Sequence, residues 1–381
     1  MQRYLLGVGN TNNINCWSST PYFILKSAKN LSFKLEGKDL NYKSQFLAKV
    51  LWNLKQFIKY RKYSGFQYSD YFVNSLIKNS HIPVNKKLTL ISYYPFLPSF
   101  PFSNNWNVYY YIDATTSQIF DHYGLFKSMS DDFRRKVLKK EKDNYIKSKV
   151  IFCMSEWAKK SLINDYNIPS KKIFVYPGGA NIDIKNLSKF IKSNPFPLFP
   201  TKKHPLRIGF LGKDWERKGG PFLYSLVNYL NSKGIPTTLR VVGVKNKIIP
   251  KCKYIKCVGP INKNKEMGKF VSEIRSWHYG SLFSVAEAYG ISNRECLMLG
   301  VPVICNNVGG ISSTIPDCKC GKLFNLEDDF SVVGDWIINQ IINYNKYLDM
   351  RLSLSKRSYE FSWDYTLKNL FKKISLTESK I

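Results

Sequence analysis

The sequence has few acidic residues for its length. Of 381 residues, 27 are aspartate or glutamate against 58 lysine or arginine, a formal net charge of +31 at pH 7. Lysine far outnumbers arginine, and asparagine, isoleucine and tyrosine are abundant, as an AT-rich genome produces without functional demand. Where the charge is functional it favours an anionic partner.

Long hydrophobic runs are absent as well. No stretch reaches the ~20 apolar residues that cross a bilayer. The first ten residues, MQRYLLGVGN, have an apolar run too short for a signal peptide and no small-residue cleavage site. We therefore expect a cytoplasmic protein, with peripheral attachment to the inner face of the membrane left open.

The eight cysteines form no pair of C-x-x-C motifs, and no histidines stand at zinc spacing. Cys252 and Cys257 enclose four residues, and Cys318 and Cys320 enclose one. We expect reduced, mostly buried thiols, and neither a metal site nor a disulfide.

Length and pattern predict two α/β domains. The chain exceeds the ~250–300 residues of a usual single core, and strand-like and helix-like segments alternate throughout, which is typical of parallel sheets covered by helices. The predicted strands of the first half are 4–8, 88–94, 108–113, 150–155 and 173–176, and the predicted helices are 131–149 and 155–166. Those of the second half are strands 206–212, 238–243 and 281–285, and helices from 221 and over 265–277.

A proline-rich stretch of little periodicity, 186–204, is the best linker candidate. We predict two doubly wound, Rossmann-like domains over 1–185 and 205–360, facing a cleft, and a final helix over 361–381. Ligands of such sheets bind beyond the carboxyl ends of the strands. The loops at those ends are therefore where we look for chemistry.

The first such loop lies in GFLGKDWERKGG (209–220), where a strand turns into a helix. Lys213, Arg217 and Lys218 surround the turn, and two glycines let a ligand approach the backbone. A helix N-terminus favours an anion, so this loop predicts a phosphate site. A solvated basic turn is the alternative.

The second loop is AEAYGISNREC (286–296), which has two carboxylates in this basic chain. Glu287 follows a strand, Gly290 permits a tight turn, and Ser292 to Glu295 reads as a capping box that would give Glu295 a purely structural role. Carboxylates accept hydrogen bonds from hydroxyls, whereas they repel phosphate. Together with the amides near Gly290 they suit a ligand that is part sugar and part phosphate. A third loop, at the end of PVICNNVGGI (302–311), lies at the same edge, which is formed by the carboxyl ends of the strands.

These blocks, with the E-x7-E spacing, followed by G-V-P-V-I and V-G-G, resemble the donor-binding half of family 4 retaining glycosyltransferases of the GT-B fold. The first half is more loosely similar through GVGN (7–10), 109–124 and 151–181, and the last helix through 359–374. The resemblance implies an acceptor-side first domain, a nucleotide-sugar domain over 205–360, and a final helix that returns to the first domain.

The resemblance also implies roles for single residues. Lys213 and Lys218 would bind the donor diphosphate, Glu295 the ribose hydroxyls, and Glu287 the donor sugar near the reacting carbon. Lys213 stands where arginine is commoner.

The backbone of Gly290 and Ile291 would lie near the donor sugar and phosphate. The sequence departs from the family pattern at Ser292, where proline is usual, and at Arg294, a bulky cation. Neither departure removes a predicted ligand.

Acceptor-side residues are Asp113 and His122, which would orient or deprotonate the acceptor hydroxyl. A helix N-cap is the alternative for Asp113, and a surface or core position for His122. Gly9 and Asn10 would touch the donor phosphates through the backbone.

The implied reaction moves a sugar from a nucleoside-diphosphate donor to a glycan or lipid-linked acceptor with retained configuration, in the synthesis of cell-surface polysaccharide, lipopolysaccharide or glycolipid. Lysines would stabilise the leaving group, and no D-x-D motif occurs, so we expect no cofactor and no divalent metal. A GT-B phosphorylase, a nucleotide-sugar epimerase and a basic nucleic-acid-binding protein are the alternatives, although we do not expect nucleic acid as a partner.

A basic amphipathic helix is predicted within 42–63. Between Leu40 and Ile112 the only acidic residue is Asp70. One face of this helix is apolar, and lysines and arginines surround it; the apolar residues are Phe46, Val50, Leu54, Phe57 and Ile58, and the basic ones are Lys43, Lys49, Lys55, Lys59, Arg61 and Lys62. This pattern, with the aromatic stretch 93–102, fits an anionic membrane surface. A helix packed on a sheet with its lysines in water is the alternative.

Overall fold

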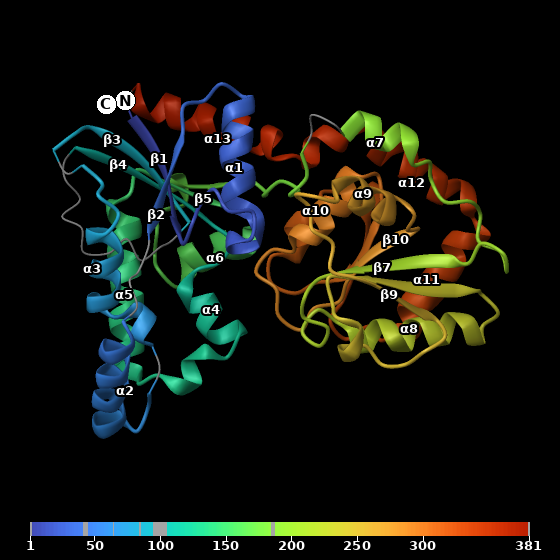
Figure 1. Cartoon of the computed structure of the whole chain (residues 1–381), viewed down its shortest axis with the longest axis horizontal. Coiled ribbons are helices and arrows are strands. Elements are labelled where there is room, and N and C mark those ends of the chain that lie inside the picture. Colours follow the sequence, from blue (N-terminus) through green and yellow to red (C-terminus); the bar gives the residue numbers. More distant parts are fainter. Residues whose placement is uncertain are drawn as a thin grey trace. The chain divides into compact units, whose positions relative to one another are not determined.

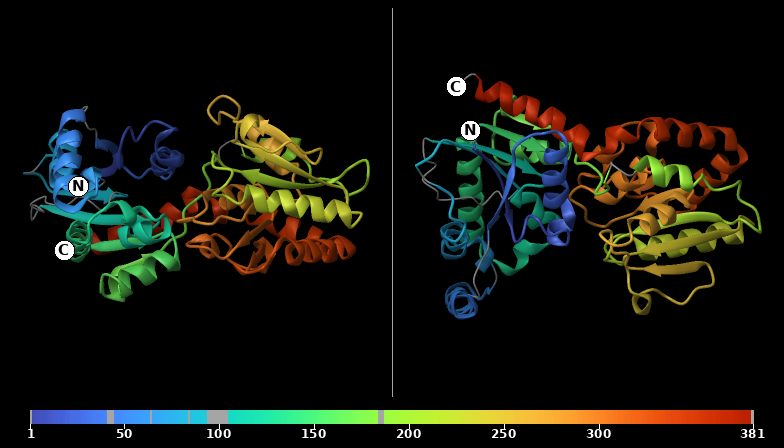
Figure 2. Two further views of the ribbon diagram at one scale, coloured as in Figure 1. Left: turned by 90° about the horizontal axis from the view of Figure 1, so that it is seen from below. Right: turned by 45° about the horizontal axis from the view of Figure 1, so that its top comes forward.

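The computed structural model describes residues 2–40, 45–63, 65–83, 85–93, 105–183 and 187–379. The chain forms two compact units, one of Met1–Pro177 with Leu367–Ile381 and one of Gly178–Thr366. Each contains a parallel sheet of six strands with helices on both faces (Figures 1 and 2). The predicted fold class, two Rossmann-like doubly wound domains, is confirmed in these two sheets.

Unit 1 has the strand order β2-β1-β3-β4-β5-β6. Its strands are β1 (Gln2–Val8), β2 (Glu36–Leu40), β3 (Leu88–Ser92), β4 (Trp106–Ile112), β5 (Val150–Cys153) and β6 (Ile173–Val175). Every residue of β3 and β4 is buried, because helices cover both faces of a parallel sheet. This double burial explains why the central strands are mostly apolar in the sequence, with few polar residues among them.

The helices of unit 1 are α1 (Thr20–Asn30), α2 (Phe46–Tyr60), α3 (Asp70–Lys78), α4 (Thr116–His122), α5 (Asp131–Lys147) and α6 (Glu156–Asn164). Helix α5 packs on the sheet through Tyr145, whose ring meets those of Tyr110 and Tyr166 edge-on at 5.3 and 5.6 Å between centroids. The predicted helices over 131–149 and 155–166 are therefore present, slightly shortened.

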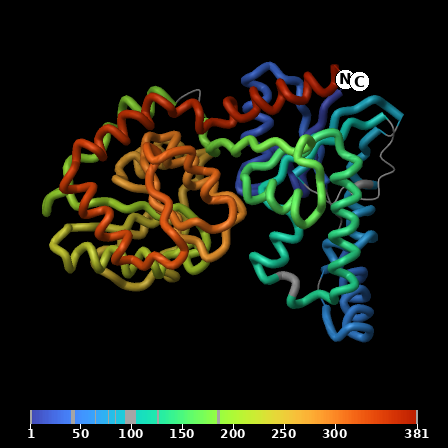
Figure 3. Tube along the Cα trace, turned by 180° about the vertical axis from the view of Figure 1, so that it is seen from behind, coloured from blue at the N-terminus to red at the C-terminus, as the bar shows by residue number. Residues whose placement is uncertain are grey.

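The last helix, α13 (Trp363–Glu378), ends in unit 1. Phe371 stacks on Phe33 with centroids 3.6 Å apart, and Arg3 Nη2 donates to Glu378 Oε2 at 3.0 Å. The two ends of the chain thus lie side by side in unit 1 (Figure 3).

Unit 2 has the strand order β12-β11-β10-β7-β8-β9. Its strands are β7 (Leu206–Leu211), β8 (Thr237–Val242), β9 (Ile255–Gly259), β10 (Tyr279–Leu282), β11 (Val303–Asn306) and β12 (Gly321–Phe324). Its helices are α7 (Leu187–Ser193), α8 (Gly220–Ser232), α9 (Met267–Arg275), α10 (Ile291–Met298), α11 (Phe330–Ile342) and α12 (Tyr344–Lys356). Because β10 pairs with both β7 and β11, the loops that follow these three strands are neighbours.

The chain passes from unit 1 to unit 2 between Pro177 and Gly178, ahead of the linker predicted over 186–204. Much of that segment belongs to the core of unit 2, where Leu187, Phe190 and Ile191 pack with Phe270 of α9. Among the described residues, no helix has the length and apolar character needed to cross a membrane.

Candidate active site

The loop between β7 and α8 is a tight turn held by its own side chains. Asp214 accepts hydrogen bonds from the backbone N–H of Arg217 at 3.1 Å and from its Nε at 3.2 Å. Gly219, with φ 80°, precedes α8, and a Cβ there would lie 2.1 Å from the carbonyl oxygen of Phe283. Only glycine allows this loop to approach the end of β10 so closely.

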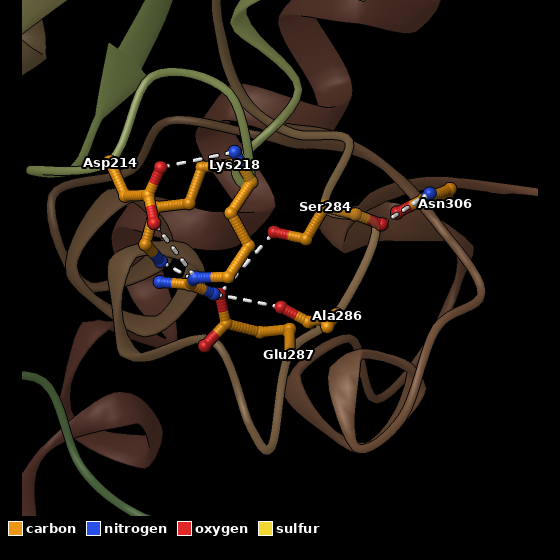
Figure 4. Close-up of polar contacts among 7 residues, drawn as sticks. Asp214, Lys218, Ser284, Ala286, Glu287 and Asn306 are labelled. Carbon is orange, nitrogen blue, oxygen red and sulfur yellow. Dashed lines mark hydrogen bonds and ion pairs between the residues drawn. The ribbon is translucent and has the colours of Figure 1, made fainter. Parts of the chain in front are cut away.

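Glu287 lies at the meeting point of two of these loops (Figure 4). Its Oε2 accepts hydrogen bonds from Lys218 Nζ at 2.7 Å, Arg217 Nη1 at 3.3 Å and Ser284 Oγ at 3.3 Å. Arg217 Nη1 also donates to the carbonyl oxygen of Ala286 at 2.7 Å. The side chains of Glu287 and Lys218 are only 13% and 15% exposed, so solvent screens this ion pair weakly.

Of the two lysines predicted to bind the diphosphate, Lys218 contacts Glu287 and Lys213 does not. Lys218 runs across Gly212, whose added Cβ would lie 2.4 Å from Lys218 Cδ, and reaches Glu287. Lys213 is exposed, and no partner of its side chain is found among the described residues. Arg217, which the sequence placed only in a basic turn, proves to be the second cation beside Glu287.

Glu295 is buried on the first turns of α10 and forms an ion pair with Lys263, which lies between β9 and α9. Lys263 Nζ also lies 4.4 Å from the centroid of the Phe270 ring. The predicted capping box is wrong: Gly290 occupies the N-cap of α10, and no side chain caps that helix. A buried carboxylate needs a cation as partner more than a helix end needs one more acceptor, so Glu295 faces Lys263.

The turn before α10 depends on Gly290, which has φ 95° and whose Cβ would lie 2.8 Å from Leu282 Cδ2. Ile291 is the first residue of the helix. The third loop supports this turn, since Gly310 N donates to the Glu287 carbonyl at 3.4 Å and Asn306 Nδ2 to that of Ser284 at 2.9 Å. The loop after β10 is therefore held by the end of the neighbouring strand β11 and the loop that follows it.

Arg294 has a structural role. It is buried, its Nε donates to the carbonyl oxygen of Gly178 at 3.0 Å, and its Nη2 donates to that of Glu360 at 2.8 Å. Tyr289 Oη donates to the same Gly178 carbonyl at 2.9 Å. Arg294, where the sequence departs from the pattern that it resembles, thus joins the first and last segments of unit 2.

In unit 1, the predicted acceptor residues lie at opposite ends of α4. Asp113 is exposed just after β4, and Thr115, not Asp113, caps the helix by accepting from Gln118 N at 3.3 Å. His122 ends the helix, with its ring 5.2 Å from that of Trp157. About 10 Å of helix separates the two residues, so the structure does not bring them together.

Gly9 and Asn10 follow β1. The backbone N–H of Gly9 donates to the carbonyl oxygen of Leu40 at 3.2 Å, and Asn10 Oδ1 accepts from Asn12 N at 2.9 Å. The Gly9 amide and the Asn10 side-chain oxygen therefore hold the loop itself in this structure.

Glu141, on α5, is a residue that the sequence reading missed. Its carboxylate is fully buried and accepts hydrogen bonds from Thr116 N at 3.0 Å, Tyr145 Oη at 2.7 Å and Tyr166 Oη. Burial raises its pKa to about 7, and the surrounding donors oppose that rise. Glu141 fixes the start of α4 at Thr116, three residues after Asp113. The only sequence signal was an acid at the centre of a lysine-rich helix.

No group of three or more histidine, cysteine, aspartate or glutamate side chains able to hold a metal ion occurs among the described residues. All eight cysteines are free thiols.

No protein-family model and no curated protein matches the sequence. Solved structures do match it. Sucrose-phosphate synthase from Thermosynechococcus elongatus is 12% identical with a TM-score of 0.67, and all of both chains is covered. Anabaena Alr3699/HepE, solved with UDP-glucose, is 11% identical with a TM-score of 0.62, over 98% of this chain and 99% of that one.

WaaG, a glycosyltransferase involved in lipopolysaccharide biosynthesis, is 12% identical with a TM-score of 0.59, over 97% of this chain and 99% of that one. The chain has the GT-B fold. At this level of identity the likeness establishes the architecture, whereas activity has to be argued from the side chains at the strand ends.

Proposed function

We propose that the protein is a glycosyltransferase that moves a sugar from a nucleoside-diphosphate donor to a glycan or lipid-linked acceptor, in the synthesis of cell-surface polysaccharide, lipopolysaccharide or glycolipid. The observation that carries the proposal is the contact of Glu287 with Lys218 and Arg217 at the carboxyl end of β10. The structural relatives support it, since one was solved with UDP-glucose and another acts in lipopolysaccharide synthesis.

The ion pairs of unit 2 suit a ligand that carries both phosphates and hydroxyls. We propose that the donor diphosphate binds Lys218 and Lys213, with Arg217 beside it, and that Glu287 then accepts hydrogen bonds from the donor sugar. Each hydrogen bond to a charged group contributes about 1.5–3 kcal/mol. The backbone of Gly290 and Ile291, at the start of α10, would face the sugar and phosphate.

Glu295 would accept hydrogen bonds from the ribose hydroxyls. In the structure it is buried beside Lys263, and a single cation leaves a carboxylate capacity for further donors. Lys263 would hold the carboxylate in place for that contact.

We propose that transfer retains the anomeric configuration. The acceptor oxygen forms a bond to the anomeric carbon while the bond from that carbon to the phosphate oxygen breaks. The acceptor proton passes to the departing phosphate on the same face, and the nucleoside diphosphate leaves. Lys218 and Lys213 stabilise its charge, a role that a metal fills in other enzymes, so we expect no divalent metal requirement.

On unit 1, we propose that Asp113 and His122 orient the acceptor, and that the backbone of Gly9 and Asn10 contacts the donor phosphates. Glu141 is a positioning residue in this proposal, because it holds Thr116 at the start of α4 and thereby the loop that bears Asp113.

Ligand-dependent thermal stabilisation tests the proposal. UDP, GDP, ADP, CMP and their sugar conjugates would each be added with and without EDTA. A ligand at 100 times its dissociation constant adds about 2.7 kcal/mol, so we expect one diphosphate to stabilise the protein selectively and EDTA to change nothing.

The matched variants are Lys218→Met and Lys233→Met, the second being an exposed lysine that follows the C-terminal end of α8, whereas Lys218 precedes the N-terminal end of that helix. Lys218→Met should lose most of the stabilisation and Lys233→Met should keep it. Equal stabilisation of both variants, or no stabilisation by any nucleotide, would contradict the assignment. Salt-sensitive binding of nucleic acid in place of nucleotide binding would favour the alternative of a basic nucleic-acid-binding protein.

A further inference from the structure

Helix α2 presents its apolar side chains to solvent. Seven large apolar residues of this helix are exposed, from 44% at Phe57 to 75% at Leu47. They are Phe46, Leu47, Val50, Leu51, Leu54, Phe57 and Ile58. A surface helix normally turns such a stripe toward the core, whereas α2 turns it toward solvent.

The seven side chains form one continuous surface. At 3.6 residues per turn they fall within a sector of about 140° that contains no charged residue. The opposite side faces unit 1: the Trp52 ring lies 5.1 Å from that of Phe133 and 6.4 Å from that of Phe66, and Gln56 is buried. The protein therefore fixes α2 by its mixed face and leaves its apolar face exposed.

Lys49 and Lys55 flank this apolar face on its two sides, and Lys59 lies farther round the helix. Lys49, Lys55 and Lys59 lie on α2 outside the apolar sector, Arg61 and Lys62 follow it directly, and all five are exposed. The helix itself has no acidic residue. Lys43 and, apart from Tyr93, the aromatic stretch 93–102 lie outside the described residues.

The position of α2 and its charge indicate which partner covers its apolar face. Helix α2 lies at the end of unit 1 away from the chain termini (Figures 1 and 3). A second copy of the chain would place the same patch on both sides of a twofold interface, so the lysines beside the apolar face would meet other lysines, and α2 has no acidic residue to pair with them. An anionic bilayer instead receives apolar side chains below its headgroups while lysine stems extend to the phosphates.

We propose that α2 is an interfacial membrane anchor that lies flat on an anionic bilayer, with its seven apolar side chains inserted and its basic residues on lipid phosphates. The inference rests on α2 alone and does not require the proposed transferase activity. If that activity holds, attachment would place the enzyme where a lipid-linked acceptor is found.

Co-sedimentation with vesicles tests the anchor. The whole protein would be mixed with vesicles of phosphatidylcholine alone or of phosphatidylcholine with phosphatidylglycerol, at low and high salt. We expect recovery with the anionic vesicles, much weaker recovery with the neutral ones, and a decline with salt, since each lysine near an anionic surface strengthens binding several-fold.

Two variants separate the components of binding. Leu47→Gln with Leu51→Gln removes two of the most exposed apolar chains, and Lys49→Gln with Lys55→Gln removes the charges that flank the apolar face; each should lower the partition coefficient at least about tenfold. Controls are Ile342→Gln, an apolar residue 72% exposed on unit 2, and Lys202→Gln with Lys203→Gln. These should bind as the unchanged protein does.

All α2 variants should keep the melting temperature and nucleotide response of the unchanged protein, because the substituted side chains are exposed. Should the double leucine variant fail to fold, Leu51→Gln alone serves the same purpose. Equal recovery with neutral vesicles, no loss in either α2 variant, or self-association that the leucine variant abolishes without vesicle binding would each overturn the proposal.

Discussion

Each of the two units has a six-stranded parallel sheet, but the surroundings of their carboxylates differ. In unit 2, Glu287 lies in the loop after β10 and Glu295 on the helix α10 that follows it, each paired with a lysine. In unit 1, Glu141 is buried among tyrosine hydroxyls and a backbone amide. Ion pairs at a rim can exchange partners with a ligand, whereas a buried hydroxyl network belongs to the scaffold. Substitutions in unit 2 should therefore affect ligands, and those at Glu141 stability.

The strongest test of this difference is Glu287→Gln. We expect the rate of sugar transfer to fall at least about a hundredfold, because a preorganised charged contact near the reacting carbon is lost. Folding and diphosphate binding should persist, since Lys218 remains. The rate would be measured with the donor that stabilises the protein.

Glu216→Gln is the matched control, because Glu216 is an exposed carboxylate of the same loop as Lys218. It should transfer sugar at the unchanged rate. If Glu287→Gln also retained full transfer, Glu287 would have no role in the reaction, and another residue would have to contact the donor sugar.

In unit 1, Glu141→Gln should change the pH dependence of stability. Burial raises the pKa of Glu141 from 4.5 to about 7, so the folded state retains a proton that the unfolded state has already lost. The stability contributed by the neutral carboxyl is fully present below pH 4.5 and is lost as the pH rises to about 7. The total change is about 3 kcal/mol.

Denaturant unfolding at a series of pH values measures this effect. The Glu141→Gln protein should gain stability relative to the unchanged protein as the pH rises through that window, while the exposed-site control Glu327→Gln should parallel the unchanged protein. Parallel curves for Glu141→Gln would mean that the buried carboxyl does not titrate in this range.

The smallest effect concerns Glu295. If its carboxylate binds the ribose, Glu295→Gln should weaken binding of the stabilising nucleoside diphosphate about tenfold and that of its 2′-deoxy form much less. Titration calorimetry with both nucleotides gives the ratio. A ratio that the substitution leaves unchanged would confine Glu295 to its ion pair with Lys263.

The sequence predicted the central strands better than the edge strands. Buried on both faces, β3 and β4 are mostly apolar and have no charged residue, whereas the edge strand β2, EGKDL, is half-exposed and has charged side chains. Edge strand β9, IKCVG, is also largely half-exposed. An edge strand forms because a neighbour offers unpaired backbone groups, which local composition does not show.

At the site, spacing along the chain located Glu287 and Lys218 on neighbouring loops, and the structure joins them. It did not show that Arg217 would reach Glu287, because a turn's side-chain directions depend on Asp214 and on the approach to Phe283. Nor did it find Lys263, which lies 32 residues from Glu295 along the chain.

The sequence by itself therefore determined what depends on local periodicity and residue type: two parallel α/β domains, the loops at their strand ends, the basic turn between β7 and α8 and the amphipathic character of α2. Tertiary structure alone decided which charges pair, that Arg294 joins the ends of unit 2, that Glu141 is buried, and that the apolar face of α2 points outward. Such partners come from distant parts of the chain, and their choice depends on burial and Coulomb energy at positions that only the packed fold defines.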